Sequence, residues 1–211
     1  MKYNYLVIEG NIGAGKTTLS TMLAEDTGSR LMLEQFSDNP FLARFYEDPE
    51  RYAFQVELSF LSERYQQIKT ELGHHDLFGQ GVISDYYLAK SFIFSKHNLK
   101  DDEMKLFEKL FSIIQLQVPR PDLYVYLHLP VEQLLENIRQ RGRPYEKQIP
   151  GEYLREIQEG YFGFFRTQTD MKIAVVDTSS FDFVNKTTDY QQLKKIILEE
   201  DFKPGMNRLI L

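Results

Sequence analysis

The chain has 211 residues, of which 42% are apolar, and this composition is typical of a soluble globular domain with a sizeable core. Its 25 Lys and Arg against 31 Asp and Glu give a net charge of −6, without the basic footprint of a nucleic-acid-binding protein. The absence of Cys excludes a disulfide framework and a thiolate site. We expect one cytoplasmic domain, residues 1–211, with neither nucleic acid nor a membrane as partner, because no apolar run approaches the roughly 20 residues of a membrane helix.

Short β-rich segments alternate with helical segments along the chain. The expected strands are residues 3–9, 30–33, 81–84, 122–129 and 172–177. The expected helices are residues 16–26, 39–46, 49–73, 101–117, 130–140, 150–167 and 190–200. This alternation predicts an α/β fold with a five-stranded parallel sheet and helices on both faces. Ligands of such sheets bind beyond the carboxyl ends of the strands.

The first of these strands leads into a turn rich in glycine. The turn reads Gly10, Asn11, Ile12, Gly13, Ala14, Gly15, Lys16, Thr17 and Thr18. It fits the phosphate-loop pattern G-x-x-x-x-G-K-[ST], after a strand and before a helix. Its backbone N–H groups can surround anionic oxygens, while Lys16 supplies a charge for the β- and γ-phosphates and Thr17 a ligand for Mg²⁺. A bound nucleoside triphosphate is expected, and an ordinary glycine-rich turn is the alternative.

Two acids stand where expected strands end, Glu34 and Asp85. Both should face the cleft near the phosphate loop. A kinase that phosphorylates a hydroxyl needs a base to orient and deprotonate it, and carboxylates or waters to hold Mg²⁺. Either acid suits these roles, and a loop cap or a surface charge is the alternative for each.

Three arginines, Arg139, Arg141 and Arg143, follow the end of an expected helix. Cations are mildly favoured there by the helix dipole, which is one interpretation. The other is a short mobile lid, about residues 139–149, that closes over the triphosphate and neutralises charge during transfer. The phosphate loop elsewhere in the chain favours the lid.

Together these segments resemble the deoxynucleoside kinase family. The similar segments are "GNIGAGKTT", "LMLEQF", "YEDPERYAFQ", "VISDYY" and "RGRPYEKQIPGEYL", and their order covers nearly the whole chain. The resemblance implies a P-loop kinase fold with an arginine-rich lid, and a homodimer. The helix expected at residues 101–117 is apolar on most sides, so it is either buried or part of a subunit interface.

The resemblance also implies roles around the acceptor nucleoside. Glu34 resembles the catalytic base that contacts the 5′-hydroxyl of the deoxyribose. Tyr46 and Glu146 resemble the pair that binds the 3′-hydroxyl. Gln55 resembles the residue that makes paired hydrogen bonds to the base, with Phe54 beside it. An amide suits a base edge because it offers one donor and one acceptor.

A second set of implied roles concerns ATP and Mg²⁺. Asp85 resembles an acid that lies near Mg²⁺ and the phosphates, so Asp85 and Thr17 are the expected metal ligands. Lys16, Arg141 and Arg143 are expected at the phosphates, with Arg139 as a further candidate. Asp182 and Phe183 are expected near the adenine of ATP.

The chain departs from the family at several of these places. Tyr86 replaces the Arg that follows the family's acid, so Lys90 or Arg139 would have to supply its phosphate contacts. Ser91 replaces an Asp that helps to set base preference in deoxycytidine kinase. Asn137 replaces the first lid Arg.

The sequence therefore predicts a kinase that transfers the γ-phosphate of ATP to the 5′-hydroxyl of a deoxynucleoside. Glu34, Lys16, Arg141 and Asp85 are the expected catalytic residues. Deoxyadenosine is the favoured acceptor, with other purine deoxynucleosides or deoxycytidine as alternatives. Two other functions stay open: a nucleoside monophosphate kinase, which needs cations for the acceptor's phosphate, and a non-catalytic nucleotide-binding switch.

Overall fold

The computed structural model describes residues 2–35, 39–73 and 80–209, and the strands of this part form one parallel sheet. The strand order is β2-β3-β1-β4-β5-β6. The bounds are Tyr5–Gly10 for β1, Arg30–Met32 for β2, Val82–Ser84 for β3, Leu123–His128 for β4, Lys172–Asp177 for β5 and Gly205–Leu209 for β6. The predicted parallel α/β fold is confirmed, and the sheet has six strands within the described ranges where the sequence predicted five.

The additional strand, β6, pairs with β5 at the edge of the sheet, from Lys172 opposite Gly205 to Val176 opposite Leu209. Its residues are half-buried or exposed rather than fully buried. A strand of this kind has no continuous apolar run, so the hydrophobic pattern did not reveal it.

Eight α-helices and one 3₁₀ helix accompany the strands in the described residues. Their bounds are Lys16–Thr27 for α1, Leu42–Glu47 for α2, Pro49–Gly73 for α3, Ala89–Asn98 for α4, Asp101–Gln115 for α5, Val131–Arg141 for α6, Gly151–Thr167 for α7, Thr187–Glu199 for α8 and Pro144–Glu146 for the 3₁₀ helix η1. None of these helices combines the length and the apolar composition that a membrane span requires. The sequence did not predict α4, because its buried face includes Lys90, Ser91 and Ser95 and so lacks an apolar period.

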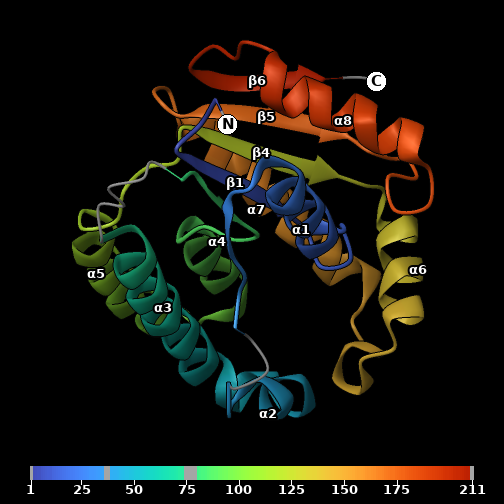
Figure 1. Cartoon of the computed structure of the whole chain (residues 1–211). Helices are drawn as coiled ribbons and strands as arrows, with labels where there is room; N and C mark the ends of the chain where they lie inside the picture. The colour runs from blue at the N-terminus through green and yellow to red at the C-terminus, as the bar shows by residue number, and fades with distance from the viewer. Residues whose placement is uncertain (1, 36–38, 74–79, 210–211) are drawn as a thin grey trace.

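The alternation of side chains along the strands divides the core between the two faces of the sheet. In β1, Leu6 and Ile8 pack into one cluster with residues of α1, α6 and α8, and Tyr5 and Val7 pack into another. The second cluster includes residues of α3, α4 and α5 and most of the buried face of α7. Figure 1 shows α3, α4 and α5 grouped together, apart from α6 and α8.

A buried carboxylate fixes the junction between the sheet and the phosphate loop. Glu9, near the end of β1, is fully buried. Its carboxylate accepts hydrogen bonds from the backbone N–H of Tyr87 at 2.9 Å, from the backbone N–H of Gly10 at 3.3 Å and from the hydroxyl of Tyr161 at 2.9 Å. Burial raises the pKa of Glu9. These donors compensate for the loss of water around the carboxylate and connect β1 to α7 and to the segment after β3.

Replacing Tyr161 by Phe removes one donor from this buried carboxylate without creating a large cavity. We expect the free energy of unfolding to fall by about 2 kcal/mol, the scale of a hydrogen bond to a charged group. Urea denaturation followed by circular dichroism measures the change.

The matched control is Tyr126→Phe. Tyr126 is equally buried, but its hydroxyl has no hydrogen-bond partner among the described residues, so its removal should be nearly neutral. Equal losses for the two variants would show that the bond to Glu9 contributes nothing.

Candidate active site

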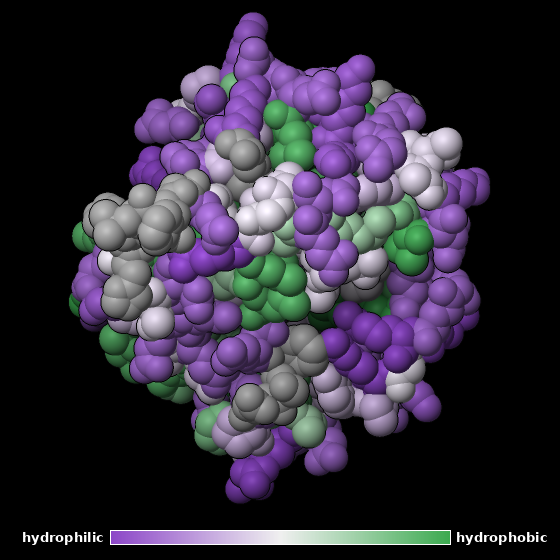
Figure 2. Space-filling model, viewed as in Figure 1, coloured by the Kyte–Doolittle hydropathy of each residue, from purple (hydrophilic) through white to green (hydrophobic). Residues whose placement is uncertain are grey.

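A pocket lies beyond the carboxyl ends of β1, β2 and β3, where the phosphate loop, the strand-end acids and the lid meet. Its lining includes Lys16, Thr17, Glu34, Tyr46, Asp85, Arg141, Arg143 and Glu146, which are residues that the sequence analysis selected. The side of the molecule drawn in Figure 2 is hollowed below its centre, with hydrophobic residues in the hollow and hydrophilic residues at its rim. The fold thus brings together side chains that are far apart in the sequence, from Lys16 near the N-terminus to Glu146 in the lid.

The phosphate loop has the backbone that its glycines predict. Gly13 and Gly15 both have a φ of 84°, in the left-handed region that favours glycine. A Cβ at Gly13 would lie 2.7 Å from the carbonyl oxygen of Leu134, and one at Gly15 would lie 2.8 Å from Cζ of Phe183. Any other residue at either place would force its neighbours apart. The contact also places Phe183 directly against the loop, whereas Asp182 accepts hydrogen bonds from the backbone and side chain of Asn185.

Lys16 lies inside the pocket rather than at its surface. Its ammonium group donates to the carbonyl oxygen of Asn11 at 2.9 Å. Burial lowers the pKa of Lys16 to about 8, and the nearby charge of Lys90 adds to the effect. A polyphosphate bound in the loop would oppose both causes, because an anion stabilises the charged form. Lys16 is therefore suited to bind an anionic ligand.

Asp85 connects the phosphate loop to Glu34. Its Oδ2 accepts from the hydroxyl of Thr17 at 2.5 Å, and its Oδ1 accepts from the backbone N–H of Glu34 at 2.8 Å. A hydroxyl and a carboxylate side by side at the phosphate loop fit Mg²⁺, which is commonly held by one or two protein oxygens together with phosphates and waters. No cluster of three or more acidic, His or Cys side chains that could hold a metal by itself occurs in residues 2–35, 39–73 and 80–209.

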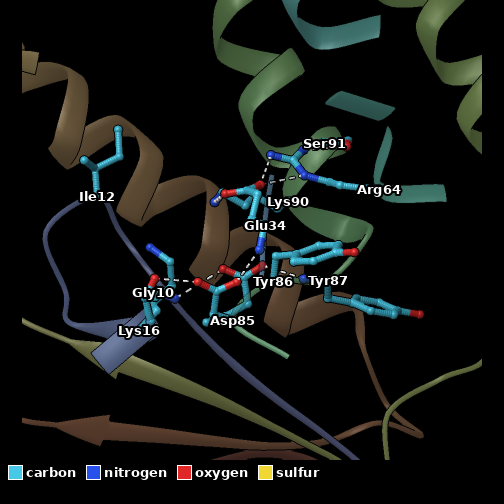
Figure 3. Close-up of polar contacts among 12 residues, drawn as sticks. Gly10, Ile12, Lys16, Glu34, Arg64, Asp85, Tyr86, Tyr87, Lys90 and Ser91 are labelled. Atoms are coloured by element: carbon cyan, nitrogen blue, oxygen red, sulfur yellow. Dashed lines mark hydrogen bonds and ion pairs between the residues drawn. The ribbon is translucent and has the colours of Figure 1, made fainter. Parts of the chain in front are cut away.

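Glu34 forms the densest set of charged contacts in the pocket. Its Oε1 accepts from Nε and Nη2 of Arg64 at 2.8 and 2.6 Å, and its Oε2 accepts from Nζ of Lys90 at 2.6 Å. Figure 3 shows the carboxylate of Glu34 directed toward Arg64 and Lys90. Asp85 lies between Glu34 and Lys16 in this view. Burial raises the pKa of Glu34, but the charges and hydrogen bonds of Lys90 and Arg64 outweigh it and hold the pKa far below the ordinary value. Glu34 is therefore ionised at neutral pH.

Tyr86 and Ser91, which stand where the family has an Arg and an Asp, both have hydrogen-bond partners. Tyr86 is fully buried, and its hydroxyl donates to Gln67 at 2.8 Å. Ser91 accepts from Nη1 of Arg64 at 2.6 Å. The sequence analysis did not select Arg64 or Lys90 for Glu34, although both are buried on helices that face it.

The lid residues are divided between the pocket and its outer side. Arg141 and Arg143 line the pocket, and both contact the buried carboxylate of Glu146 on η1. The structure does not bring Arg139 into the pocket lining: it pairs with Glu136 at 3.1 Å on the exposed side of α6. Asn137, the other candidate position on α6, donates to the carbonyl oxygen of Gly13 at 2.8 Å.

The expected pair for the 3′-hydroxyl lies together in the pocket. Tyr46 and Glu146 both line it, and the ring of Tyr46 stacks on Tyr145 with centroids 5.7 Å apart. Burial raises the pKa of Tyr46 and the nearby charge of Glu146 adds to this, so the phenol stays protonated. A protonated phenol and a carboxylate can donate to and accept from one hydroxyl group.

The expectation for the base-contacting residue does not match the structure. Gln55 is exposed, Phe54 is half-buried, and neither lines the pocket. The buried face of α3 instead contains Glu57 and Arg64, together with Ala53, Val56, Leu61 and Ile68. Gln55 and Phe54 were assigned by the resemblance, and the charged side chains at two inward positions of α3 obscure its buried face in the sequence. The signal was available in the spacing, since Glu57 and Arg64 are seven residues apart and so lie on one face of a helix.

Comparisons with known proteins agree with the fold and identify the family. The family model for deoxynucleoside kinase matches residues 6–201. The chain is 33% identical to a deoxyguanosine kinase of Bacillus subtilis, over 92% of this chain and 96% of that protein. It is 28% identical to a deoxyadenosine/deoxycytidine kinase of the same organism, over 91% and 90% of the two chains.

A solved structure gives the same result for the fold. The structure of a deoxyadenosine kinase from M. mycoides matches with a TM-score of 0.78 and 24% identity, over 91% of this chain and 98% of that one. Residues 6–201, which the family model matches, include the phosphate loop, Glu34, Asp85, α3 and the lid. The chain belongs to the deoxynucleoside kinase family, a family of phosphotransferase enzymes.

Proposed function

We propose that this kinase transfers the γ-phosphate of ATP, with Mg²⁺, to the 5′-hydroxyl of a purine deoxynucleoside. The observation that carries the proposal is the position of Glu34, an ionised carboxylate fixed beside the phosphate loop through Asp85. Oε1 accepts two hydrogen bonds from Arg64, whereas Oε2 accepts one from Lys90 and keeps a lone pair that can accept from a hydroxyl. The relatives' names support a deoxynucleoside as the acceptor.

In the proposed reaction Glu34 accepts the hydrogen bond of the 5′-hydroxyl and aligns its oxygen with the γ-phosphorus. The O5′–P bond forms while the bond from the γ-phosphorus to the β,γ-bridging oxygen breaks, leaving ADP. Because the pKa of Glu34 is held low, we expect it to orient the hydroxyl and to take the proton only late in the transfer. A loose transition state of phosphoryl transfer needs little assistance from a strong base.

The chain's own cations stabilise the charge on the phosphates. Lys16 lies at the loop, and Arg141 and Arg143 face the pocket from the lid while in contact with Glu146. Thr17 and Asp85 would hold Mg²⁺, which neutralises charge on the β- and γ-phosphates. Transfer then requires the arginines to exchange Glu146 for phosphate oxygens.

A nucleoside monophosphate kinase fits the pocket less well. Its acceptor carries a phosphate next to the reacting oxygen, and this needs additional cations. Arg64 and Lys90 are already paired with Glu34. Arg44 and Arg51 are exposed on α2 and α3, where each lies within 6 Å of the ring of Tyr52 rather than in the pocket.

The proposal also covers the cellular location and the oligomeric state of the protein. We place it in the cytoplasm, where ATP is abundant. We also propose a homodimer, because α5 buries Phe107 and Phe111 but exposes Leu106, Ile113 and Leu116, the last by 85%. An exposed apolar helix face of this kind is common at protein interfaces.

A panel of acceptors tests the reaction itself. Purified protein with ATP and Mg²⁺ should convert at least one deoxynucleoside to its 5′-monophosphate, as read by chromatography. Diphosphates formed only from monophosphates would assign the protein to the rival kinase class. Nucleotide binding without transfer to any acceptor would favour a switch.

Replacing Glu34 by Gln should lower kcat by at least about 100-fold, the lower end of what a positioned base contributes. The amide keeps the size of the side chain but removes the acceptor charge. The dissociation constant for ATP, measured by calorimetry, should stay close to that of the wild type. Glu50→Gln, the same exchange at an exposed position outside the pocket, is the control. A turnover unaffected by Glu34→Gln would refute the assignment.

Replacing Ile113 by Asp should disrupt the proposed dimer. A charge at the centre of the exposed face of α5 cannot be buried without a partner. Light scattering coupled to gel filtration should give a dimer mass for the wild type and a monomer mass for Ile113→Asp. A monomeric wild type would contradict the proposal, and Glu108→Lys, at an exposed position of α5 well away from Ile113 around the helix, is the control.

A further inference from the structure

The pocket continues past Glu34 into an apolar end that contains one carboxylate. Glu57 on α3 lines this end and is 3% exposed. Val56, Phe60, Phe94 and Tyr153 line the pocket with it, and Asn98 at the end of α4 is beside it. The transfer reaction described above does not use Glu57. A buried carboxylate among aromatic side chains is costly unless something binds it.

The hydrogen bonds of Glu57 leave one of its oxygens available. Asn98 Nδ2 donates to Oε1 of Glu57 at 2.6 Å and also lies 3.4 Å from the hydroxyl oxygen of Tyr153. Oε2 accepts no hydrogen bond from any residue in the described ranges. Because Glu57 lines the pocket, this acceptor is available to a ligand that donates hydrogen bonds.

The groups around Glu57 set its charge. Arg64 on α3, Lys90 on α4 and Glu34 after β2 face it, and the phenols of Tyr46 and Tyr153 close the pocket around it. Burial raises the pKa of Glu57 to about 7, against the hydrogen bond of Asn98 and the charges of Arg64 and Lys90. Both protonation states are therefore populated near neutral pH, and a bound group with two N–H donors would favour the ionised one.

Among the four bases, guanine has the edge that matches this arrangement. Its N1–H and N2–H₂ are adjacent donors, and its O6 acceptor lies next to them. An ionised carboxylate accepts two hydrogen bonds and offers none, and the bond from Asn98 to Oε1 holds this carboxylate in place. Adenine and cytosine present one donor and one acceptor on the same edge, which an amide or a protonated acid matches and an ionised carboxylate does not.

We propose that Glu57, supported by Asn98, binds N1–H and N2–H₂ of guanine and makes deoxyguanosine the preferred acceptor of this kinase. The inference rests on the proposed function and specifies its acceptor. It replaces Gln55 as the base-contacting residue, because Gln55 does not line the pocket. It also replaces the preference for deoxyadenosine, which rested on the resemblance and on Ser91, a residue that the structure shows bound to Arg64.

The variant Glu57→Gln tests this role because it exchanges two acceptors for one acceptor and one donor at constant size. We expect kcat/KM for deoxyguanosine to fall by about 100-fold, the scale of losing a paired contact to a base. We expect kcat/KM for deoxyadenosine or deoxycytidine to rise. Glu63→Gln on the same helix, outside the pocket and bonded to Ser59, is the matched control and should leave both values unchanged.

A pH series supplies a readout that a merely structural role would not affect. The ionised fraction of Glu57 increases as pH rises through its pKa of about 7. The ratio of kcat/KM for deoxyguanosine to that for deoxyadenosine should therefore increase with pH in the wild type. The ratio cancels effects common to both acceptors, such as the titration of Lys16. In Glu57→Gln the ratio should not change with pH.

The outcomes separate this inference from the proposed function. If the wild type phosphorylates deoxyadenosine better than deoxyguanosine throughout the series, the inference fails and the kinase function stands. If Glu57→Gln lowers kcat/KM equally for every acceptor, Glu57 is only structural and the inference again fails. If the wild type phosphorylates no deoxynucleoside, the proposed function fails and the inference fails with it.

Discussion

The pocket depends on one partly buried carboxylate held between two buried cations. Glu34 follows β2, Arg64 belongs to α3 and Lys90 to α4, so their contacts join three elements that come from separate parts of the chain. Taking three charged groups out of water is costly, and such a group is weak evidence for stability. Its effect here is positional. Because both oxygens of Glu34 are held, the carboxylate has one orientation and one charge before any ligand arrives, and this preorganisation is what a transfer that relies on alignment requires.

A second carboxylate, Asp85, connects that group to the phosphate loop. It bonds the side chain of Thr17 with one oxygen and the backbone of Glu34 with the other. Glu34 and the phosphate loop are therefore joined through a single side chain that follows β3. Parallel strands make this possible, because their carboxyl ends meet at one edge of the sheet and bring short-range features of the sequence into contact.

The parts that sequence reasoning predicted are those with a local signal. The phosphate loop has a fixed spacing, and Glu34 and Asp85 directly follow short apolar runs. The parts that it missed lack such a signal. Helix α4 presents Lys90 and Ser91 to the interior, and α3 presents Glu57 and Arg64, so their buried faces are not apolar and the period cannot be read. These exceptions coincide with the pocket, as expected where function rather than packing selects the residues. Arg139 lies outside the pocket although Arg141 lines it, because residues two apart on a helix point to different sides.

The spacing of Glu57 and Arg64 on α3 has a geometric meaning. Seven residues of an α-helix span about 10 Å along the axis, and they bring both side chains to one face. Arg64 holds the carboxylate of Glu34, which we propose contacts the sugar hydroxyl, and Glu57 lines the pocket near Val56 and Phe60. A continuous helix cannot stretch or shorten between them. In the proposed complex, helix α3 therefore fixes the distance between the group that supports Glu34 and the group that contacts the base.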